Sequence, residues 1–223
     1  MRLIQSIADR IRSLGKPAGT LQGYENPELV ELIFEKTKAY SPEGSWSEMT
    51  GISTVLDFGG GFGLHYKLAA RQSPDISWAV VETAATVARA TKLATDRLHF
   101  FTEIEAAADW LGPIDVMHSN GALQYVPDPV ATLSRLCSLR ATTMLWYRLF
   151  LSQDHILTET QSSRLIDNGP GRAPPGTPNM VVQYARTAIP EKVFVAAHTG
   201  YSLDTRDGDF FKFRRADAAA AHV

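Results

Sequence analysis

From residue 52 onward, short apolar runs alternate with amphipathic segments and with turns rich in glycine and proline. The apolar runs have the length of buried strands, and the amphipathic segments repeat every three to four residues, as helices do. We expect strands at 52–58, 76–82, 97–101, 114–118 and 142–149, with helices at 63–71, 84–94 and 104–110 and another from Asp128-Pro129. This alternation is typical of a parallel sheet with helices on both faces.

The N-terminal 50 residues have a helical pattern instead. A helix is expected at 3–14, with apolar residues on one face and arginines largely off it. Such a basic amphipathic helix can lie on a membrane surface or pack on protein, and we favour packing because the segment is short and only weakly basic. A second helix is expected at 26–40, where Asn26 can cap the first turn and Pro27 suits the first position.

The C-terminal part predicts a hairpin and an insertion. Strands are expected at 201–206 and 210–214, joined at Asp207-Gly208-Asp209, after a helix at 190–198. The segment 151–188 is long for a loop, which indicates a functional lid or a disordered segment. Within it, we expect a helix at 155–166 and an irregular Gly/Pro loop at 168–178.

Composition narrows the function classes. The 223 residues are 44% hydrophobic, enough for the core of one α/β domain, and the formal net charge of −2 predicts no nucleic-acid partner. No apolar run approaches the ~20 residues that span a bilayer, and charged residues interrupt any signal-peptide core, so we expect no stable membrane insertion. The single cysteine, Cys137, can form no internal disulfide, which favours a cytoplasmic location and a buried apolar role.

A glycine cluster lies between the first predicted strand and helix. Residues 55–63 read Val-Leu-Asp-Phe-Gly-Gly-Gly-Phe-Gly. Four glycines in five positions indicate a tight turn whose backbone passes close to a ligand, with an anionic group at the following helix N-terminus. The spacing does not fit the dinucleotide fingerprint G-x-G-x-x-G, which disfavours a nicotinamide-dependent enzyme. It fits D-x-G-x-G-x-G, through Asp57, Gly59, Gly61 and Gly63.

This motif resembles motif I of the class I S-adenosylmethionine-dependent methyltransferases. The later stretch Leu-Gln-Tyr-Val-Pro-Asp-Pro, at 123–129, resembles their L-x-H-V-x-D-P segment. More narrowly, the wording of both stretches is similar to bacterial methyltransferase-like proteins encoded beside cell-surface polysaccharide genes. The resemblance implies a Rossmann-like, doubly wound α/β fold with a seven-stranded, mostly parallel sheet and an antiparallel last strand. It also implies S-adenosyl-L-methionine as the cofactor.

Glu82 closes the second predicted strand, and the ends of strands one and two meet at the ligand crevice of such folds. A carboxylate there can accept both hydroxyls of a ribose. The resemblance implies further cofactor contacts after strands three and four. The predicted cofactor-binding residues are Asp57, Gly59, Gly60, Gly61, Gly63, Glu82, Thr102, Glu103, Ser119 and Asn120.

Methyl transfer needs a positioned acceptor, and a general base helps when the acceptor is a hydroxyl or an amine. We predict His118, at the mouth of strand four, as the base, followed by His155 and then His65. Tyr147 and Arg148 are predicted to contact the substrate, and Arg148 could bind a carboxylate or phosphate. No His/Cys/Asp group has metal-ligand spacing, so no metal is expected.

The segments outside the motifs are predicted to control access. Candidates to cover the site are Tyr24, Tyr40 and Trp46, for which core packing is an equal alternative, and Arg172 is a weaker candidate in the Gly/Pro loop. We therefore expect an N-terminal helical segment (1–50) covering the site, a methyltransferase domain (51–215) with an insertion at about 151–188, and a loose tail (216–223).

The predicted function is S-adenosylmethionine-dependent methyl transfer to a small-molecule acceptor, with a sugar or polysaccharide precursor as the candidate. A homodimer is the candidate assembly. The alternative is a catalytically inactive domain that binds the cofactor as a regulatory or assembly subunit. The lack of the acidic residue usual after strand three, and of an evident base, keeps that alternative open.

Overall fold

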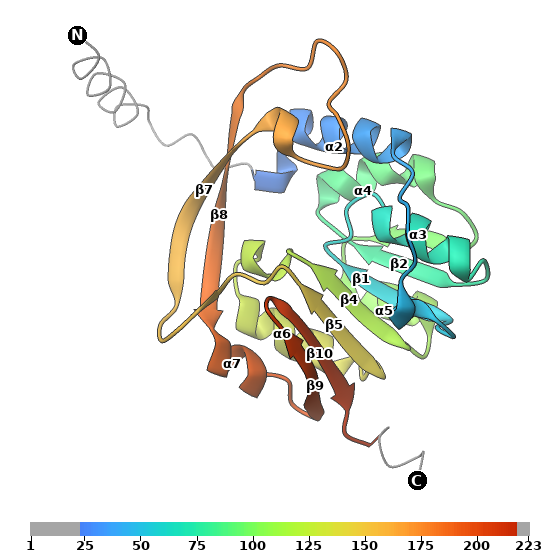
Figure 1. Ribbon diagram of the computed structural model, residues 1–223, viewed down its shortest axis with the longest axis vertical. Helices are drawn as coiled ribbons and strands as arrows, with labels where there is room; N and C mark the ends of the chain where they lie inside the picture. The colour runs from blue at the N-terminus through green and yellow to red at the C-terminus, as the bar shows by residue number, and fades with distance from the viewer. Residues whose placement is uncertain (1–22, 218–223) are drawn as a thin grey trace.

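The structure, a computed structural model shown in Figure 1, describes residues 23–217. Its seven-stranded sheet has the order β3-β2-β1-β4-β5-β10-β9. The strands are β1 (Thr54–Phe58), β2 (Ser77–Val81), β3 (Leu98–Phe101), β4 (Val116–Asn120), β5 (Thr143–Tyr147), β9 (Tyr201–Asp207) and β10 (Phe210–Arg215). Strands β1 to β5 are parallel, and β10 is antiparallel to its neighbours β5 and β9. The predicted fold class and the C-terminal hairpin are confirmed.

Helices connect these strands, as the periodicity predicted. They are α2 (Pro27–Ala39), α3 (Leu64–Gln72), α4 (Ala84–Ala90), α5 (Ile104–Leu111), α6 (Pro129–Ser138) and α7 (Glu191–Ala196). Short 3-10 turns are η1 (Gly23–Glu25), η2 (Ser47–Met49), η3 (Thr91–Leu93), η4 (Leu123–Tyr125) and η5 (Leu165–Asp167). The helix expected at 3–14 lies outside the described residues. Between residues 23 and 217, no helix has the length and apolar character to cross a membrane.

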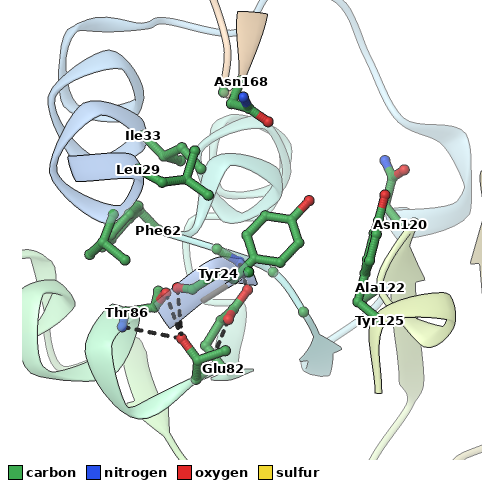
Figure 2. A pocket seen from close by; sticks show the side chains of 18 of the residues that line it. Tyr24, Leu29, Ile33, Phe62, Glu82, Thr86, Asn120, Ala122, Tyr125 and Asn168 are labelled. Atoms are coloured by element: carbon green, nitrogen blue, oxygen red, sulfur yellow. Dashed lines mark hydrogen bonds between the residues drawn. The ribbon is translucent and has the colours of Figure 1, made fainter. Parts of the chain in front are cut away.

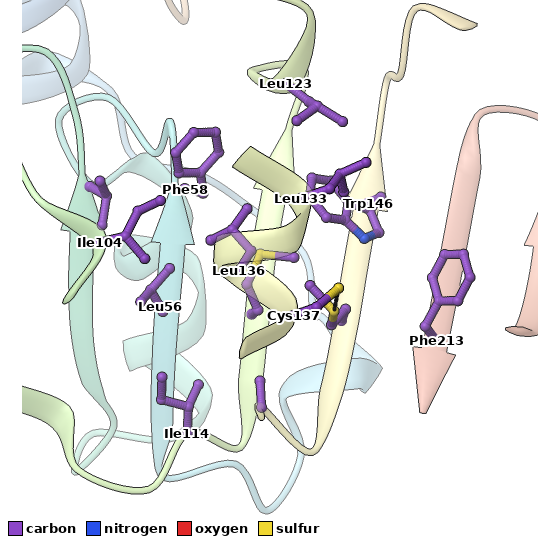
Figure 3. Packing of buried hydrophobic residues seen from close by; sticks show 14 of the residues in the cluster. Leu56, Phe58, Ile104, Ile114, Leu123, Leu133, Leu136, Cys137, Trp146 and Phe213 are labelled. Atoms are coloured by element: carbon purple, nitrogen blue, oxygen red, sulfur yellow. Dashed lines mark hydrogen bonds between the residues drawn. The ribbon is translucent and has the colours of Figure 1, made fainter. Parts of the chain in front are cut away.

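Alternating residues of the parallel strands pack on the two faces of the sheet. Leu56 and Trp146 belong to a cluster with α5, α6 and α7, and Figure 3 shows Leu136 and Cys137 of α6 in this layer. Val55, on the other side of β1, packs in a second cluster that α3 covers. Side chains alternate between the two faces along a strand. Asp57 of β1 and His118 of β4 therefore lie on the same face as Val55 and Val116, which α3 covers.

A second sheet rises beside the large one (Figure 1). Its order is β6-β8-β7, with β6 at Leu151–Ser152, β7 at Leu157–Arg164 and β8 at Val181–Pro190. The helix predicted at 155–166 is wrong, because β7 pairs antiparallel with β8 along its whole length. Thr158 and Thr160 are β-branched and point away from the protein, so this strand is polar on its outer side and carries little apolar signal.

Helix α2 is fixed to the rest of the molecule by two lysines that donate to backbone carbonyls. The nearly buried Lys36 amine donates to the carbonyl of Ile166, at 3.1 Å, and to that of Asn168. The Lys67 amine of α3 donates to the carbonyls of Thr37 and Tyr40 at the end of α2. Burial lowers the pKa of Lys36. These bonds join α2 to α3 on one side and to the segment after β7 on the other.

His198 is a buried titratable group in the core beyond α7. Its ring is 3% exposed and stacks on Phe213, with ring centroids 3.6 Å apart. Nδ1 lies 2.8 Å from the carbonyl of Phe194, so this nitrogen carries the proton and donates. Burial lowers the pKa of His198 to about 4, so the folded protein holds the ring neutral.

We predict that acid weakens the fold through His198. The unfolded chain binds a proton near pH 6.5 that the folded chain binds only near pH 4, so the free energy of unfolding should fall as pH falls through this window. Between pH 7 and pH 5 the loss should be on the order of 2 kcal/mol for this residue. Urea unfolding at both pH values tests this. The His198→Phe variant should show a smaller loss than wild type, and an unchanged loss would contradict the assignment.

Candidate functional site

A cavity of about 1090 Å³ lies at the carboxyl ends of β1, β2 and β4. Its opposite walls come from η1, α2 and the β7–β8 sheet. Figure 2 shows Glu82 near Tyr24, and Tyr125 and Asn120 on the far side of the Tyr24 ring; the Tyr24 and Tyr125 ring centroids are 5.2 Å apart. Segments far apart in the chain therefore enclose one site at the edge of the sheet where open α/β folds bind ligands.

The glycine loop forms the floor of this cavity, and the positions of its glycines leave no room or conformation for other residues. A Cβ on Gly59 would lie 2.1 Å from the Cβ of Ala122, so any side chain would collide with the loop after β4. Gly63 has a φ of +77° and begins α3 in the left-handed conformation. Gly59, Gly60 and Gly61 line the cavity, whereas Gly63 lies behind them against Leu98.

Asp57 supports the loop from below and does not line the cavity. It is fully buried, and its oxygens contact His118 Nδ1 at 2.7 Å and Trp78 Nε1 at 3.0 Å. A Cβ on Gly60 would lie 2.2 Å from the carboxylate, so the loop packs directly on it. Burial alone would raise the pKa of Asp57, but His118 and the N–H donors lower it, so the group stays ionised. Its role here is to hold the loop in place.

Glu82 faces the loop across the cavity floor. Its two oxygens accept from the backbone N–H of Gly61, at 3.0 Å, and of Thr83, at 2.8 Å. Burial raises the pKa of Glu82, while these two donors act in the opposite direction. Each carboxylate oxygen has a second lone pair, so Glu82 can still accept hydroxyl donors from a ligand in the cavity.

The other predicted cofactor residues separate into two groups. Thr102 and Asn120 line the cavity. Glu103 is exposed outside it and lies 3.7 Å from Arg135, so its predicted position at the site is wrong. Ser119 is 1% exposed and does not line the cavity, because its side chain points to the opposite face of β4 from that of Asn120.

Neither histidine predicted as the base reaches the cavity wall. His118 is fully buried, because β4 runs two residues beyond it to Asn120, so its predicted position at the strand mouth is wrong. His155 is exposed in the bend between β6 and β7 and does not line the cavity. His65, which the sequence ranked third, does line it from the first turn of α3.

His65, Asn120 and Arg148 form one hydrogen-bonded group in the cavity wall. Asn120 Nδ2 lies 3.0 Å from His65 Nε2, and its Oδ1 accepts from Arg148 Nε. Arg148 also donates from Nη2 to the Asn120 carbonyl at 3.2 Å. Its backbone has a φ of +51°, an unusual conformation for a residue with a side chain. The structure therefore holds this arginine against β4 at the cost of local backbone strain.

The remaining candidates from the sequence lie mostly away from the cavity. Tyr147 accepts a hydrogen bond at 3.3 Å from Trp46 Nε1, and both pack behind the glycine loop around His118. Tyr40 and Arg172 are exposed and do not line the cavity. Tyr24 is the member of the proposed cover that lines it.

The β7–β8 sheet contributes lining residues that the sequence analysis missed. Tyr24, Tyr125 and Tyr184 form an aromatic cluster, with ring centroids 5.0–5.9 Å apart. Gln161 Oε1 accepts from the Tyr125 hydroxyl at 2.7 Å, and Asn168 Oδ1 accepts from that of Tyr184 at 2.8 Å. No local pattern marks Gln161 and Tyr184, because the long-range pairing of β7 with β8 brings them to the site.

Among the described residues, the structure brings together a histidine and carboxylate group that no sequence spacing suggested. One potential ligand atom from each of Asp57, His65 and His118 lies within 4.8 Å of the others. The 2.7 Å contact between Asp57 and His118 is a direct hydrogen bond, which a bound metal would have to replace. The arrangement therefore works as a polar network without an ion.

No protein-family model and no curated protein matches this chain. Solved structures do share its fold. One is the sugar N-methyltransferase KedS8 from a Streptoalloteichus species, with a TM-score of 0.50, 16% identity, and coverage of 84% of this chain and 87% of that one. Another is DesVI of Streptomyces venezuelae, with a TM-score of 0.53, 14% identity, and coverage of 86% and 94%. These likenesses establish a methyltransferase-like fold.

The buried carboxylate of Asp57 should be needed for stability as well as for the site. In Asp57→Asn, one N–H donor would face an amide nitrogen in place of an oxygen, so we expect the free energy of unfolding to fall by about 2–4 kcal/mol. Urea unfolding without added ligand measures this. Asp96→Asn, at an exposed position, is the matched control and should change stability by less than about 0.5 kcal/mol. Equal effects in the two variants would contradict this role.

Proposed function

We propose that this protein is an S-adenosylmethionine-dependent methyltransferase acting on a small molecule. The observation that carries the proposal is the pairing of a bare glycine loop with Glu82 across one cavity floor. A loop of this kind accommodates the amino-acid end of a nucleoside ligand, and the carboxylate opposite accepts its ribose hydroxyls. The fold shared with KedS8 supports this proposal.

The residues present fit the cofactor. A Cβ at Gly61 would meet nothing within 4 Å, so the loop is open on its cavity side. Glu82 would hold the ribose, Gly59–Gly61 the amino-acid end, and Thr102 a part of the base. When bound, the cofactor supplies a methyl group already activated on a sulfonium. The protein then has to orient the acceptor, exclude water and take up a proton.

The other half of the cavity suits a polar acceptor with a ring. Tyr125 presents an aromatic face, and Gln161, whose oxygen accepts from the Tyr125 hydroxyl, presents an amide NH2 group that can donate to a ligand. Aromatic faces beside amides suit a sugar ring, which has apolar faces and a hydroxyl rim. Arg148 adds a cation that can bind a carboxylate or phosphate on the same molecule. We therefore infer a sugar or a sugar-linked intermediate as the acceptor.

Cofactor binding should depend on Glu82 and not on Glu103. In Glu82→Gln, an amide nitrogen replaces one of the two oxygens that now accept from Gly61 and Thr83, and the negative charge is lost. Binding of the cofactor should therefore weaken by about 1.5–3 kcal/mol, or more than tenfold. Calorimetric titration with S-adenosylhomocysteine measures the dissociation constant. Glu103→Gln, at the exposed neighbour of Thr102, is the control and should bind as wild type does. Comparable losses in both variants would contradict the assignment.

Turnover tests the reaction itself. The protein is incubated with methyl-labelled S-adenosylmethionine and a panel of neutral and amino hexoses, free and as nucleotide esters. We expect label in a methylated sugar, detected by mass spectrometry. Tight cofactor binding without transfer to any member of the panel would instead favour a domain that binds the cofactor without catalysis.

A further inference from the structure

His65 differs from the other described histidines in lining the cavity while a hydrogen bond to Asn120 holds its ring. It lies in the first turn of α3, directly after the glycine loop. Its Nε2 contacts Asn120 at the end of β4, and its Nδ1 faces Asp57 Oδ2 at 3.9 Å. The ring therefore bridges the buried carboxylate and the cavity wall.

The hydrogen-bond partners decide which ring nitrogen carries the proton. Arg148 can only donate, so the Asn120 atom bonded to its Nε must be the amide oxygen. The amide nitrogen then faces His65 Nε2 at 3.0 Å, and because this nitrogen can only donate, Nε2 must accept. In the neutral ring the proton is consequently on Nδ1, on the side of Asp57. The structure thus leaves a lone pair on Nε2 at the cavity wall.

Burial and two neighbouring cationic groups keep this ring neutral in the unliganded protein. Burial, His118 and Arg148 lower the pKa of His65 to about 4, while Asp57 acts in the opposite direction. These are the charged or titratable groups that face the ring from β1, β4 and the end of β5. Asp57 would also stabilise the imidazolium that forms when Nε2 takes up a proton, because its carboxylate lies beside Nδ1.

We propose that His65 is the catalytic base of the methyl transfer proposed above, with Asn120 and Arg148 as positioning residues that keep its Nε2 lone pair at the cavity wall. The inference rests on the proposed function and adds the residue that takes the proton. The acceptor hydroxyl or amine displaces the Asn120 N–H from Nε2 and hydrogen-bonds to it instead.

The proton and the electrons balance within this site. A lone pair of the acceptor heteroatom forms the new bond to the methyl carbon, and the electron pair of the carbon–sulfur bond stays on sulfur as a neutral thioether. The proton of the acceptor passes to His65 Nε2 and then to solvent. No oxidant, metal or further reactant is needed.

Other groups at the site are less suited to this role. His118 is fully buried behind the loop. Burial and the neighbouring tyrosines raise the pKa of Tyr24 well above its ordinary value, so its phenol stays protonated and cannot accept a proton. Asp57 does not line the cavity. His65 combines access to the cavity, an Nε2 lone pair that only the Asn120 amide engages, and a nearby carboxylate.

Nitrogen NMR of the histidine rings tests the proton position without any turnover. In the complex with S-adenosylhomocysteine at neutral pH, wild type should show His65 protonated on Nδ1. Asn120→Asp replaces the donor with an acceptor, so the His65 proton should move to Nε2. Asn168→Asp is the matched control, since Asn168 bonds to Tyr184 and not to His65, and it should leave the ring unchanged. A wild-type proton on Nε2 would overturn the proposal.

A kinetic comparison tests the base itself, with the acceptor that the sugar panel identifies. His65→Gln keeps an acceptor for Asn120 but cannot take up a proton, so turnover should fall about 100-fold or more. Affinity for S-adenosylhomocysteine should stay within about threefold, and the exposed His155→Gln should behave as wild type. Unchanged turnover in His65→Gln would overturn the proposal.

The two proposals fail differently. Loss of the proposed function would appear as no binding of S-adenosylhomocysteine to wild type, whereas failure of the base assignment leaves that binding intact. The NMR result is read independently of turnover: a proton on Nδ1 that moves in Asn120→Asp supports the positioning of His65 by Asn120, and any other pattern overturns it.

Discussion

The site depends on one buried carboxylate. Asp57 lies near the end of β1 with no exposure to solvent, and its cost of desolvation is offset by the hydrogen bonds to Trp78 and His118. Because the loop touches the carboxylate directly, its path is determined by the polar network below it as well as by glycine conformations. The floor of the cavity therefore rests on the same buried layer as the strands of the sheet.

Much of this arrangement could be read from the sequence, since it is local. Strand and helix periods predicted the alternation of strands and helices, Asn26 predicted the start of α2 with its side chain accepting from Glu28 and Leu29, and Asp207-Gly208 predicted the hairpin. Position along a strand was enough to bring Glu82 opposite the glycine loop. Each of these features is decided within a few neighbouring residues.

The rest depends on partners distant in the chain. β7 has a polar, alternating sequence that acquires its structure from β8, so the residues it carries to the site could not be predicted. The sequence analysis placed His118 at the end of the strand, but β4 continues to Asn120. This difference of two residues puts Asn120 in the cavity wall and His118 in the buried polar network. The orientation of His65 depends on the Asn120 amide, which Arg148 orients in turn. Arg148 lies 83 positions after His65 in the sequence, so no local pattern predicts this relation.

The lysine contacts of α2 carry a mechanical consequence. The Lys36 amine donates to the carbonyls of the segment that follows β7, and the Lys67 amine of α3 donates to the carbonyl of Thr37, in the same last turn of α2. The wall after β7 and the wall formed by α3 are therefore both bonded to the last turn of α2. An acceptor that moves β7 and β8 toward the cavity would also move α2 toward the bound cofactor. Binding of the acceptor and binding of the cofactor would then be coupled without direct contact between the two ligands.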